Sequence, residues 1–169
     1  MNRDAATTTD LIASSASPAL TPALLALNNA HATELSWLEP ERLDTMIAGA
    51  FMARAIGQAE ALLIAFDQGA AYDGANFLWF RARYPRFVYV DRIVTASEAR
   101  GRGHARRLYA GLFEAARAAG HDRIVCEVNV EPPNPGSMAF HGALGFAEVG
   151  RAVIDDGRKT VAYLACPLG

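Results

Sequence analysis

The sequence contains few cysteines, no long hydrophobic run and almost no excess of charge. Cys126 and Cys166 are isolated and lack the spacing of metal ligands, which argues against a zinc site and against a disulfide framework. No apolar stretch approaches the roughly 18 residues of a membrane-spanning helix, so we expect no membrane partner. The net charge of −2 gives no general attraction to nucleic acid. We therefore expect a cytoplasmic protein that holds no metal.

The chain is long enough to bury a substantial core. It has 169 residues, of which 51% are hydrophobic and 20% charged, as is ordinary for one globular domain. Residues 1–20 are rich in Ala, Ser and Thr, and Asp4 and Asp10 interrupt any signal-peptide core. We expect residues 1–20 to be a flexible segment with one short strand at Asp10–Ala13. A single domain should then span residues 21–169.

The first half of the domain predicts helices before strands. Pro22 suits a first helical turn and is followed by an apolar helical face, and a second helix should restart at Glu39-Pro40-Glu41. The run Ala59–Phe66 is short and apolar, which favours a strand, and Asp67–Asn76 is typical of a polar loop. The aromatic stretch after it contains Pro85, which breaks any long element.

The second half predicts alternating strands and helices. Expected elements are a strand at Phe87–Thr95, a helix from Ala105 to Gly120, a strand at Arg123–Val130, a short helix between Asn134 and Gly145, and closing strands at Phe146–Ala152 and Thr160–Ala165 around an Asp156-Gly157 turn. This order predicts a mixed α/β sheet with at least one parallel crossover. Pro132-Pro133 should form a rigid bulge where the Arg123–Val130 strand ends, and the register of Glu127 and Asn129 stays open.

A glycine-rich turn between a strand and a helix suggests an anion site. Arg100-Gly101-Arg102-Gly103-His104-Ala105 lets the backbone approach a ligand, and the first N–H groups of the helix point outward at its positive end. Nearby arginines, Arg106 among them, add positive charge. A diphosphate needs this combination of convergent donors and open space. The alternative is a tight turn with solvated arginines.

Two segments together resemble the GNAT superfamily of N-acetyltransferases. The first signature, Arg/Gln-x-x-Gly-x-Gly/Ala, is matched by Arg100, Gly103 and Ala105. The second, Asn-x-x-Ala/Ser-x-x-Phe-Tyr-x-x-x-Gly-Phe, is matched by Asn134, Ser137, Phe140, Gly145 and Phe146, with His141 where tyrosine is usual. The resemblance covers about half the chain, from Phe87 onward.

The resemblance implies an α/β fold with a mostly antiparallel twisted sheet, splayed central parallel strands and flanking helices. It also implies acetyl-CoA as co-substrate, with its pantetheine arm between the splayed strands. The residues it assigns to that ligand are the backbone of Ile93, Val94 and Thr95, the turn residues Arg100, Gly101, Arg102, Gly103, His104, Ala105 and Arg106, and Asn134, Ser137 and Phe140 on the opposite wall.

Acetyl transfer to an amine needs a base, an oxyanion donor and a proton for the leaving thiolate. A backbone N–H near Val94 is the expected oxyanion donor. His141 is the candidate proton donor, and the alternative is a histidine that fills space between helix and sheet. Asp91 and Glu127 are candidate bases because charge is unusual in the middle of strands. The alternative for both is a buried structural ion pair, for Asp91 with Arg92.

The sequence does not identify the acceptor. A small amine, an amino acid or a peptide N-terminus all remain open, as does the choice between a monomer and a homodimer. His31 and His121 are expected at the surface. Polar candidates for the acceptor side are Asn28, Asn29 and Glu34, for which solvation of a helix surface is the favoured alternative. Aromatic candidates are Tyr72, Trp79 and Tyr84, for which packing in the core and at the lip is the favoured alternative. A non-catalytic acyl-CoA-binding sensor is the main alternative to an enzyme, whereas a nucleic-acid-binding patch at RGRGHARR is disfavoured by the acidic balance.

Overall fold

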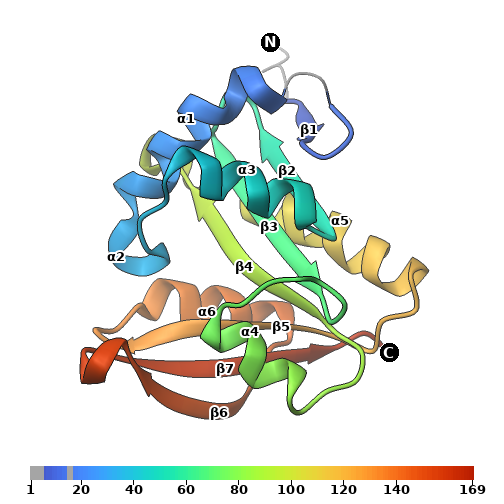
Figure 1. Ribbon diagram of the computed structural model, residues 1–169, viewed down its shortest axis with the longest axis vertical. Helices are drawn as coiled ribbons and strands as arrows, with labels where there is room; N and C mark the ends of the chain where they lie inside the picture. The colour runs from blue at the N-terminus through green and yellow to red at the C-terminus, as the bar shows by residue number, and fades with distance from the viewer. Residues whose placement is uncertain (1–5, 15–16) are drawn as a thin grey trace.

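A seven-stranded sheet forms the centre of the molecule (Figure 1). The computed structural model describes residues 6–14 and 17–169. The strand order is β1-β2-β3-β4-β5-β7-β6, and every neighbouring pair is antiparallel except β4 and β5. The strands are β1 (Thr8–Asp10), β2 (Met52–Ile56), β3 (Ala61–Asp67), β4 (Val88–Thr95), β5 (Arg123–Glu131), β6 (Ala147–Ile154) and β7 (Lys159–Pro167). The predicted mixed sheet with at least one parallel crossover is confirmed.

Helices cover both faces of the sheet and bury an apolar cluster under each. The α-helices are α1 (Ser17–Ala30), α2 (Ala32–Leu35), α3 (Pro40–Gly49), α4 (Ala75–Arg81), α5 (His104–Ala118) and α6 (Pro135–Leu144), and single 3-10 turns occur at Ser97–Ala99 and Asp155–Gly157. Side chains of α1, α3 and α4 enter one cluster, and those of α5 and α6 pack into or against the other. No helix in the described parts of the chain has the length and apolar character needed to cross a bilayer.

Strands β4 and β5 diverge soon after they meet. They pair in parallel at Val88↔Ile124 and Tyr89↔Val125. Beyond that point β4 continues beside β3 while β5 turns away with β7, as the ribbon shows (Figure 1). The ladder of β3 and β4 shifts by one residue between Ile64 and Ala65, so that Asp91 has no partner on β3. This bulge bends β4 and opens the splay that the family resemblance implied.

Several sequence-based boundaries need correction. Helix α1 begins at Ser17 and contains Pro22 in its interior, because Pro18 already fits the first turn. The N-terminal strand lies at Thr8–Asp10 rather than Asp10–Ala13. Strand β2 was not predicted, since an alanine-rich segment directly after a helix gives no turn signal. Helix α4 was not predicted either, because aromatic residues have modest helix propensity and this helix depends on burying Phe77 and Phe80.

The expected turns and caps near the C-terminus are present. Asn134 caps α6, Pro135 is its first residue, and Gly145 ends it at a φ of 101°. The predicted bulge at Pro132-Pro133 corresponds to an isolated bridge between Val130 and Pro133 and to a register shift between β5 and β7. The Asp156-Gly157 turn joins β6 to β7 as expected.

Candidate active site

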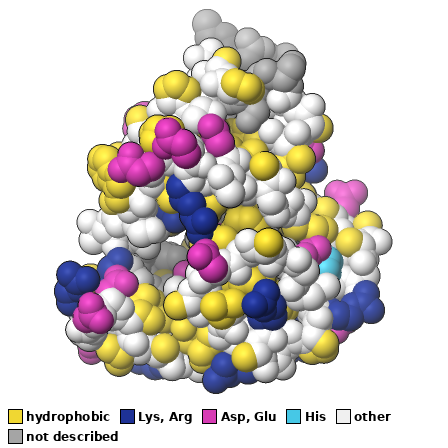
Figure 2. All heavy atoms as spheres, viewed as in Figure 1, with side chains coloured by type: hydrophobic (Ala, Val, Ile, Leu, Met, Phe, Trp, Pro, Cys, Tyr) yellow, Lys and Arg dark blue, Asp and Glu magenta, His cyan; other side chains and the backbone are white. Residues whose placement is uncertain are grey.

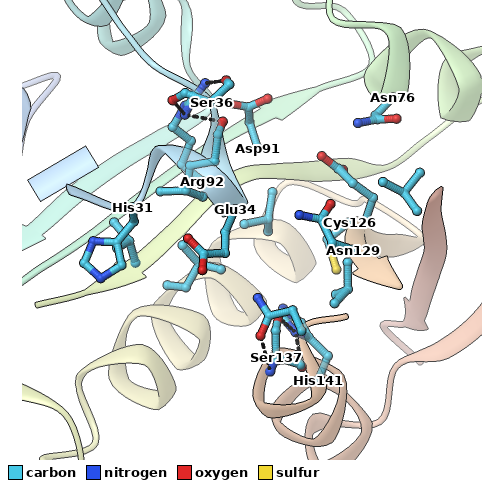
Figure 3. A pocket seen from close by; sticks show the side chains of 18 of the residues that line it. His31, Glu34, Ser36, Asn76, Asp91, Arg92, Cys126, Asn129, Ser137 and His141 are labelled. Atoms are coloured by element: carbon cyan, nitrogen blue, oxygen red, sulfur yellow. Dashed lines mark hydrogen bonds and ion pairs between the residues drawn. The ribbon is translucent and has the colours of Figure 1, made fainter. Parts of the chain in front are cut away.

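A cavity of about 800 Å³ opens where β4 and β5 separate. One wall comes from the α1–α2 region, the opposite wall from α6, and the far end from the β6–β7 hairpin. The surface is hollowed on the left side of the space-filling view, below the α1–α2 region (Figure 2). The close view shows His31 and Asn76 at opposite ends of this cavity, with Asp91 above and Ser137 below (Figure 3). The cavity therefore brings together distant parts of the chain.

The edge of β4 that faces away from β3 lines one side of the cavity. Ile93, Val94 and Thr95 all line it, and on their other side they pair with β3. The N–H of Ala96 donates to the carbonyl of Glu60 at 2.8 Å, on the β3 side. Because N–H groups alternate along a strand, the N–H of Val94 also points toward β3, and those of Ile93 and Thr95 point into the splay. The candidate oxyanion donors near Val94 are therefore the N–H groups of Ile93 and Thr95.

The start of α5 has the open backbone that an anion requires. Gly101 and Gly103 have φ values of 77° and 79°, and a Cβ at either position would meet nothing within 4 Å. The N-cap of this 15-residue helix is Gly103, which has no side chain to cap the first turn. Arg100 and Ala105 line the adjoining end of the cavity. Unpaired amides, open space and a cation fit a diphosphate group.

Two side chains of the turn contact a neighbouring carboxylate. Arg102 and His104 both pair with Oε2 of Glu60, at 3.3 and 2.9 Å. His104 is buried, whereas Arg102 and Arg106 are exposed. The side chain of Arg102 is 59% exposed, so it remains solvated while it pairs with Glu60. The contribution of this segment to an anion site rests on its backbone amides and on Arg100.

The opposite wall is the first turn of α6. The side-chain oxygen of Asn134 accepts a hydrogen bond from the backbone N–H of Ser137 at 3.2 Å, so Asn134 acts as the N-cap. Both residues line the cavity, as does Phe140, whose ring packs 5.8 Å from that of Tyr109. The sequence assigned these residues to ligand contact, and the structure gives Asn134 a capping role as well.

His141 is held by two neighbours and is only 2% exposed. Its Nδ1 lies 2.8 Å from the carbonyl oxygen of Ser137, and its Nε2 lies 2.7 Å from the hydroxyl of Tyr109 (Figure 3 shows the Ser137 contacts). A carbonyl can only accept, so Nδ1–H donates and Nε2 accepts from Tyr109. Burial lowers the pKa of His141, which keeps the ring neutral. These contacts favour the packing alternative over direct proton donation.

We expect His141 and Tyr109 to stabilise the fold as one unit. His141→Phe removes the ring nitrogen that accepts the hydrogen bond of the buried Tyr109 hydroxyl, which should lower the free energy of unfolding by about 2 kcal/mol. Tyr109→Phe should cost a similar amount, and the double variant should cost less than the sum of the two. Urea denaturation of the four proteins measures this coupling. Strict additivity would show that the contact contributes nothing.

Asp91 forms the ion pair that the sequence offered as an alternative. Its Oδ2 lies 3.0 Å from Nε of Arg92, and its Oδ1 accepts a 2.6 Å hydrogen bond from Tyr72. Arg92 is 4% exposed, and its guanidinium also donates to Asn28 and to the Leu35 carbonyl, at 2.8 and 2.7 Å. Asp91 is thus a fixed, charge-balanced group at the bulge, which makes it less available as a base.

Glu127 has no cationic partner among the described residues. Its Oε1 accepts a 3.0 Å hydrogen bond from the Tyr89 hydroxyl, while Oε2 is buried and has no hydrogen-bond partner among the residues that the structure describes. Burial, together with the nearby charge of Asp91, raises the pKa of Glu127 to about 8, although the hydrogen bond from Tyr89 opposes this shift. The buried-ion-pair alternative is therefore wrong for Glu127. With its raised pKa and without a cationic partner, the carboxyl group of Glu127 is suited to accept a proton from a substrate.

The acceptor-side wall differs from the sequence expectation. Asn28 is fully buried, and its side-chain oxygen accepts a hydrogen bond from Arg92. The side-chain amide of Asn29 donates to the carbonyl of Leu38 and accepts from its N–H. Both side chains are therefore occupied by structural hydrogen bonds and are not available to bind a substrate. Glu34 and Tyr72 do line the cavity, and so does His31, which was expected at the surface. Trp79 and Tyr84 pack outside it. These assignments depend on tertiary contacts that no local sequence pattern contains.

Within residues 6–14 and 17–169, no group of three or more His, Cys, Asp or Glu side chains is arranged to bind a metal ion. Cys126 and Cys166 are free and buried, and Cys126 lines the cavity.

The chain has relatives of known activity. It is 34% identical over 113 residues to the aminoglycoside N(6')-acetyltransferase type 1 of Serratia marcescens, covering 66% of this chain and 70% of that protein. Its fold matches the ribosomal-protein-S18-alanine N-acetyltransferase of Escherichia coli, with a TM-score of 0.65, 15% identity and coverage of 96% and 94% of the two chains. It also matches an aminoglycoside 6'-N-acetyltransferase complexed with coenzyme A, with a TM-score of 0.70, 14% identity and coverage of 96% and 97%.

The family model of the acetyltransferase (GNAT) family matches residues 24–146, which include the splayed strands, the turn before α5 and all of α6. The match agrees with the seven-stranded sheet and its single parallel pair. The chain therefore belongs to the GNAT family and is an acyl-CoA-dependent N-acetyltransferase.

Proposed function

We propose that this enzyme transfers the acetyl group of acetyl-CoA to a primary amine of a small acceptor, by direct attack in a ternary complex. The observation that carries the proposal is the division of one cavity into two chemically different ends. The guanidinium of Arg100, beside the open start of α5, lies 3.5 Å from the ring of His31 at one end, whereas Glu127 lies toward Asn76 at the other end, with Asp91 between them (Figure 3). An anionic donor would therefore enter from the Arg100 end and a cationic acceptor from the carboxyl end, and the two would meet in the middle of the cavity.

The donor end fits coenzyme A through its backbone. The amides of Gly101–Arg106 would hold the diphosphate, with Arg100 beside them. The N–H and C=O groups on the free edge of β4, at Ile93–Thr95, would hold the pantetheine arm as a neighbouring strand would. When bound, acetyl-CoA supplies an activated acyl group. Ser137 and Phe140 on α6 would close the other side of the arm.

The acceptor end fits an amine that arrives protonated. Glu127 would take the proton from the ammonium group through Oε2, and its raised pKa suits that task because it makes the carboxylate a stronger base than an ordinary glutamate. Asp91, although paired with Arg92, would add negative potential near the nitrogen. The N–H of Ile93 or Thr95 would stabilise the negative charge that develops on the carbonyl oxygen.

The acceptor that we favour is a polar amine with further amino or hydroxyl groups, such as an aminoglycoside. The support is the 34% identity to an aminoglycoside acetyltransferase and a cavity that adds Glu34 and Asn76 to the two carboxyl groups. The test measures thiol release from acetyl-CoA with an aminoglycoside, a short diamine and an alanine-terminated peptide, and identifies products by mass spectrometry. Amine-dependent thiol release with an acetylated product supports the proposal. Absence of any acetylated amine across this panel rejects it.

A further inference from the structure

The carboxylate of Glu60 holds the glycine-rich turn before α5 from outside the cavity. Glu60 is the last residue of the hairpin turn between β2 and β3. Its Oε2 accepts hydrogen bonds from Nε2 of His104 at 2.9 Å and from Nη1 of Arg102 at 3.3 Å. A carboxylate offers only acceptors, so Nε2 of His104 carries the hydrogen. One oxygen atom of Glu60 therefore fixes two side chains of the turn.

The contact with His104 is better shielded from solvent than an ordinary surface pair. The side chain of His104 is 9% exposed and that of Glu60 is 32% exposed, whereas that of Arg102 is 59% exposed. Exposed ion pairs contribute little, because water and salt screen them. The hydrogen bond to His104 is therefore the firmer of the two constraints on the turn.

Glu60 is itself fixed by its backbone. Its N–H donates to the carbonyl of Ile56, and its carbonyl accepts from the N–H of Ala96, both at 2.8 Å. Ala96 follows the last residue of β4, and β3 begins directly beside the end of β4 (Figure 1). Glu60 thus contacts both segments that we propose hold coenzyme A, the end of β4 through its main chain and the turn through its side chain.

A turn built on two glycines needs such an anchor. Gly101 and Gly103 have φ values of 77° and 79°, and glycine loses more backbone freedom on ordering than any other residue. When a binding segment becomes ordered only on contact with its ligand, the cost is subtracted from the affinity. A Cβ at either glycine would meet nothing within 4 Å, so the hold on this part of the turn comes from Arg102 and His104.

We propose that Glu60 is a positioning residue of the donor site: by holding Arg102 and His104 against the β2–β3 hairpin, it keeps the turn in the shape that presents its backbone amides to the diphosphate before coenzyme A arrives. This inference rests on the proposed function, because it takes the turn as the place where the diphosphate lies. A negative charge near an anion site is unfavourable by itself, so the site needs the reach of the Glu60 oxygen rather than its charge. Both partners share Oε2, so the amide oxygen of a glutamine can accept both hydrogen bonds.

The test measures the Kd of coenzyme A by isothermal titration calorimetry in three variants of Glu60. Glu60→Ala removes the acceptor and should raise the Kd about 10-fold. Glu60→Asp keeps the charge but withdraws the oxygen by one methylene, so it should raise the Kd about 3-fold or more, and it carries the test if Glu60→Ala does not fold. Glu60→Gln keeps the reach and should stay within about 2-fold of the wild type.

Glu98→Ala is the matched control. Glu98 is exposed in the single 3-10 turn that precedes the glycines, so its replacement removes one negative charge from the same region. Its carbonyl, which accepts from Nη2 of Arg102 at 3.2 Å, is kept in the variant. The Kd of coenzyme A should therefore stay within about 2-fold of the wild-type value.

Pantetheine separates positioning of the turn from general damage to the protein, because it lacks the diphosphate. Its Kd, measured by NMR titration, should agree within about 2-fold between the wild type and Glu60→Ala, since the arm would lie on the edge of β4. A variant that is merely less well folded would lose affinity for both ligands in the same proportion. Neither measurement needs an acceptor, so neither depends on which amine the enzyme acetylates.

Three results would overturn the inference: coenzyme A binding in Glu60→Ala and Glu60→Asp as tight as in the wild type, an equal loss for coenzyme A and pantetheine, or a Glu60→Gln protein as weak as Glu60→Ala. Gly103→Glu distinguishes these from a failure of the proposed function. If Gly103→Glu binds coenzyme A normally, the diphosphate lies elsewhere and both proposals fail. If it loses binding while Glu60→Ala and Glu60→Asp do not, the donor site stands and the role of Glu60 is wrong.

Discussion

Replacing Gly103 by glutamate is expected to abolish coenzyme A binding, with an increase in Kd of at least about 100-fold, or ~2.7 kcal/mol. Gly103 is the N-cap of α5 at a φ of 79°, and the space around its missing Cβ is open. A glutamate there places a negative charge and a bulky side chain where phosphate oxygens must approach the helix amides. Isothermal titration calorimetry with coenzyme A at physiological salt measures the effect.

An uncharged variant of the same shape separates the effect of the negative charge on binding from the effect of backbone strain. Gly103→Gln has nearly the same shape and the same left-handed backbone cost, about 1 kcal/mol, without the charge. It should weaken binding by roughly 5- to 10-fold, far less than Gly103→Glu. Thermal unfolding of both variants should agree within a few degrees, since nothing packs against this position. Normal binding by Gly103→Glu would show that the diphosphate does not lie on this turn.

The sequence predicted the elements whose signals are local. Asn134 and Pro135 mark the start of α6, and Gly145 marks its end, because capping chemistry depends on a few neighbouring residues. The strand and helix on either side of the glycine turn were predicted for the same reason. Strand β2 lacked such signals. Its four buried positions gain their stability from β1 and β3 on either side, and a single sequence does not show these partners.

The sequence predicted which residues belong to the candidate site better than it predicted how those residues contact one another. Charge in the middle of two strands identified Asp91 and Glu127, but it did not reveal which of them is paired. That difference comes from the bulge in β4, which depends on the register with β3, and from Arg92, whose guanidinium reaches residues in α1 and α2. The motif placed His141 beside the ligand, yet its hydrogen bond to Tyr109 joins two helices and has no local signature.

Replacing Glu127 by glutamine is expected to lower kcat by about 100- to 10,000-fold, with little change in the KM for acetyl-CoA. Glutamine keeps the shape and can keep the hydrogen bond from Tyr89, but it cannot accept the proton of an ammonium group. Glu148→Gln is the matched control. Glu148 is partly exposed on β6 and pairs with Arg151 at the surface, so its replacement changes the net charge equally and should leave turnover unchanged.

The pH dependence of kcat tests whether Glu127 must lose its proton before it can act as the base. The pKa of Glu127 is raised to about 8, so the carboxyl is mostly protonated at pH 6 and becomes a competent base as the pH rises. The kcat of the wild type should therefore climb about 10-fold per pH unit below pH 8 and level off above it. The residual rate of Glu127→Gln should lack this dependence. An unchanged profile in that variant would assign the base to another group.

The same shift predicts that the Glu127→Gln protein is more stable than the wild type. Because the folded pKa lies above the unfolded value near 4.5, the folded state binds the proton more tightly, and wild-type stability falls as the pH rises from about 4.5 to about 8. Glutamine removes this loss. At pH 9 the free energy of unfolding should rise by at least ~2 kcal/mol, and at pH 4 the two proteins should be nearly equal. Denaturant titrations at both pH values measure the difference. A variant that is inactive but no more stable at pH 9 would show that the carboxyl is not held in an unfavourable buried state, and this would remove the physical basis for its raised pKa.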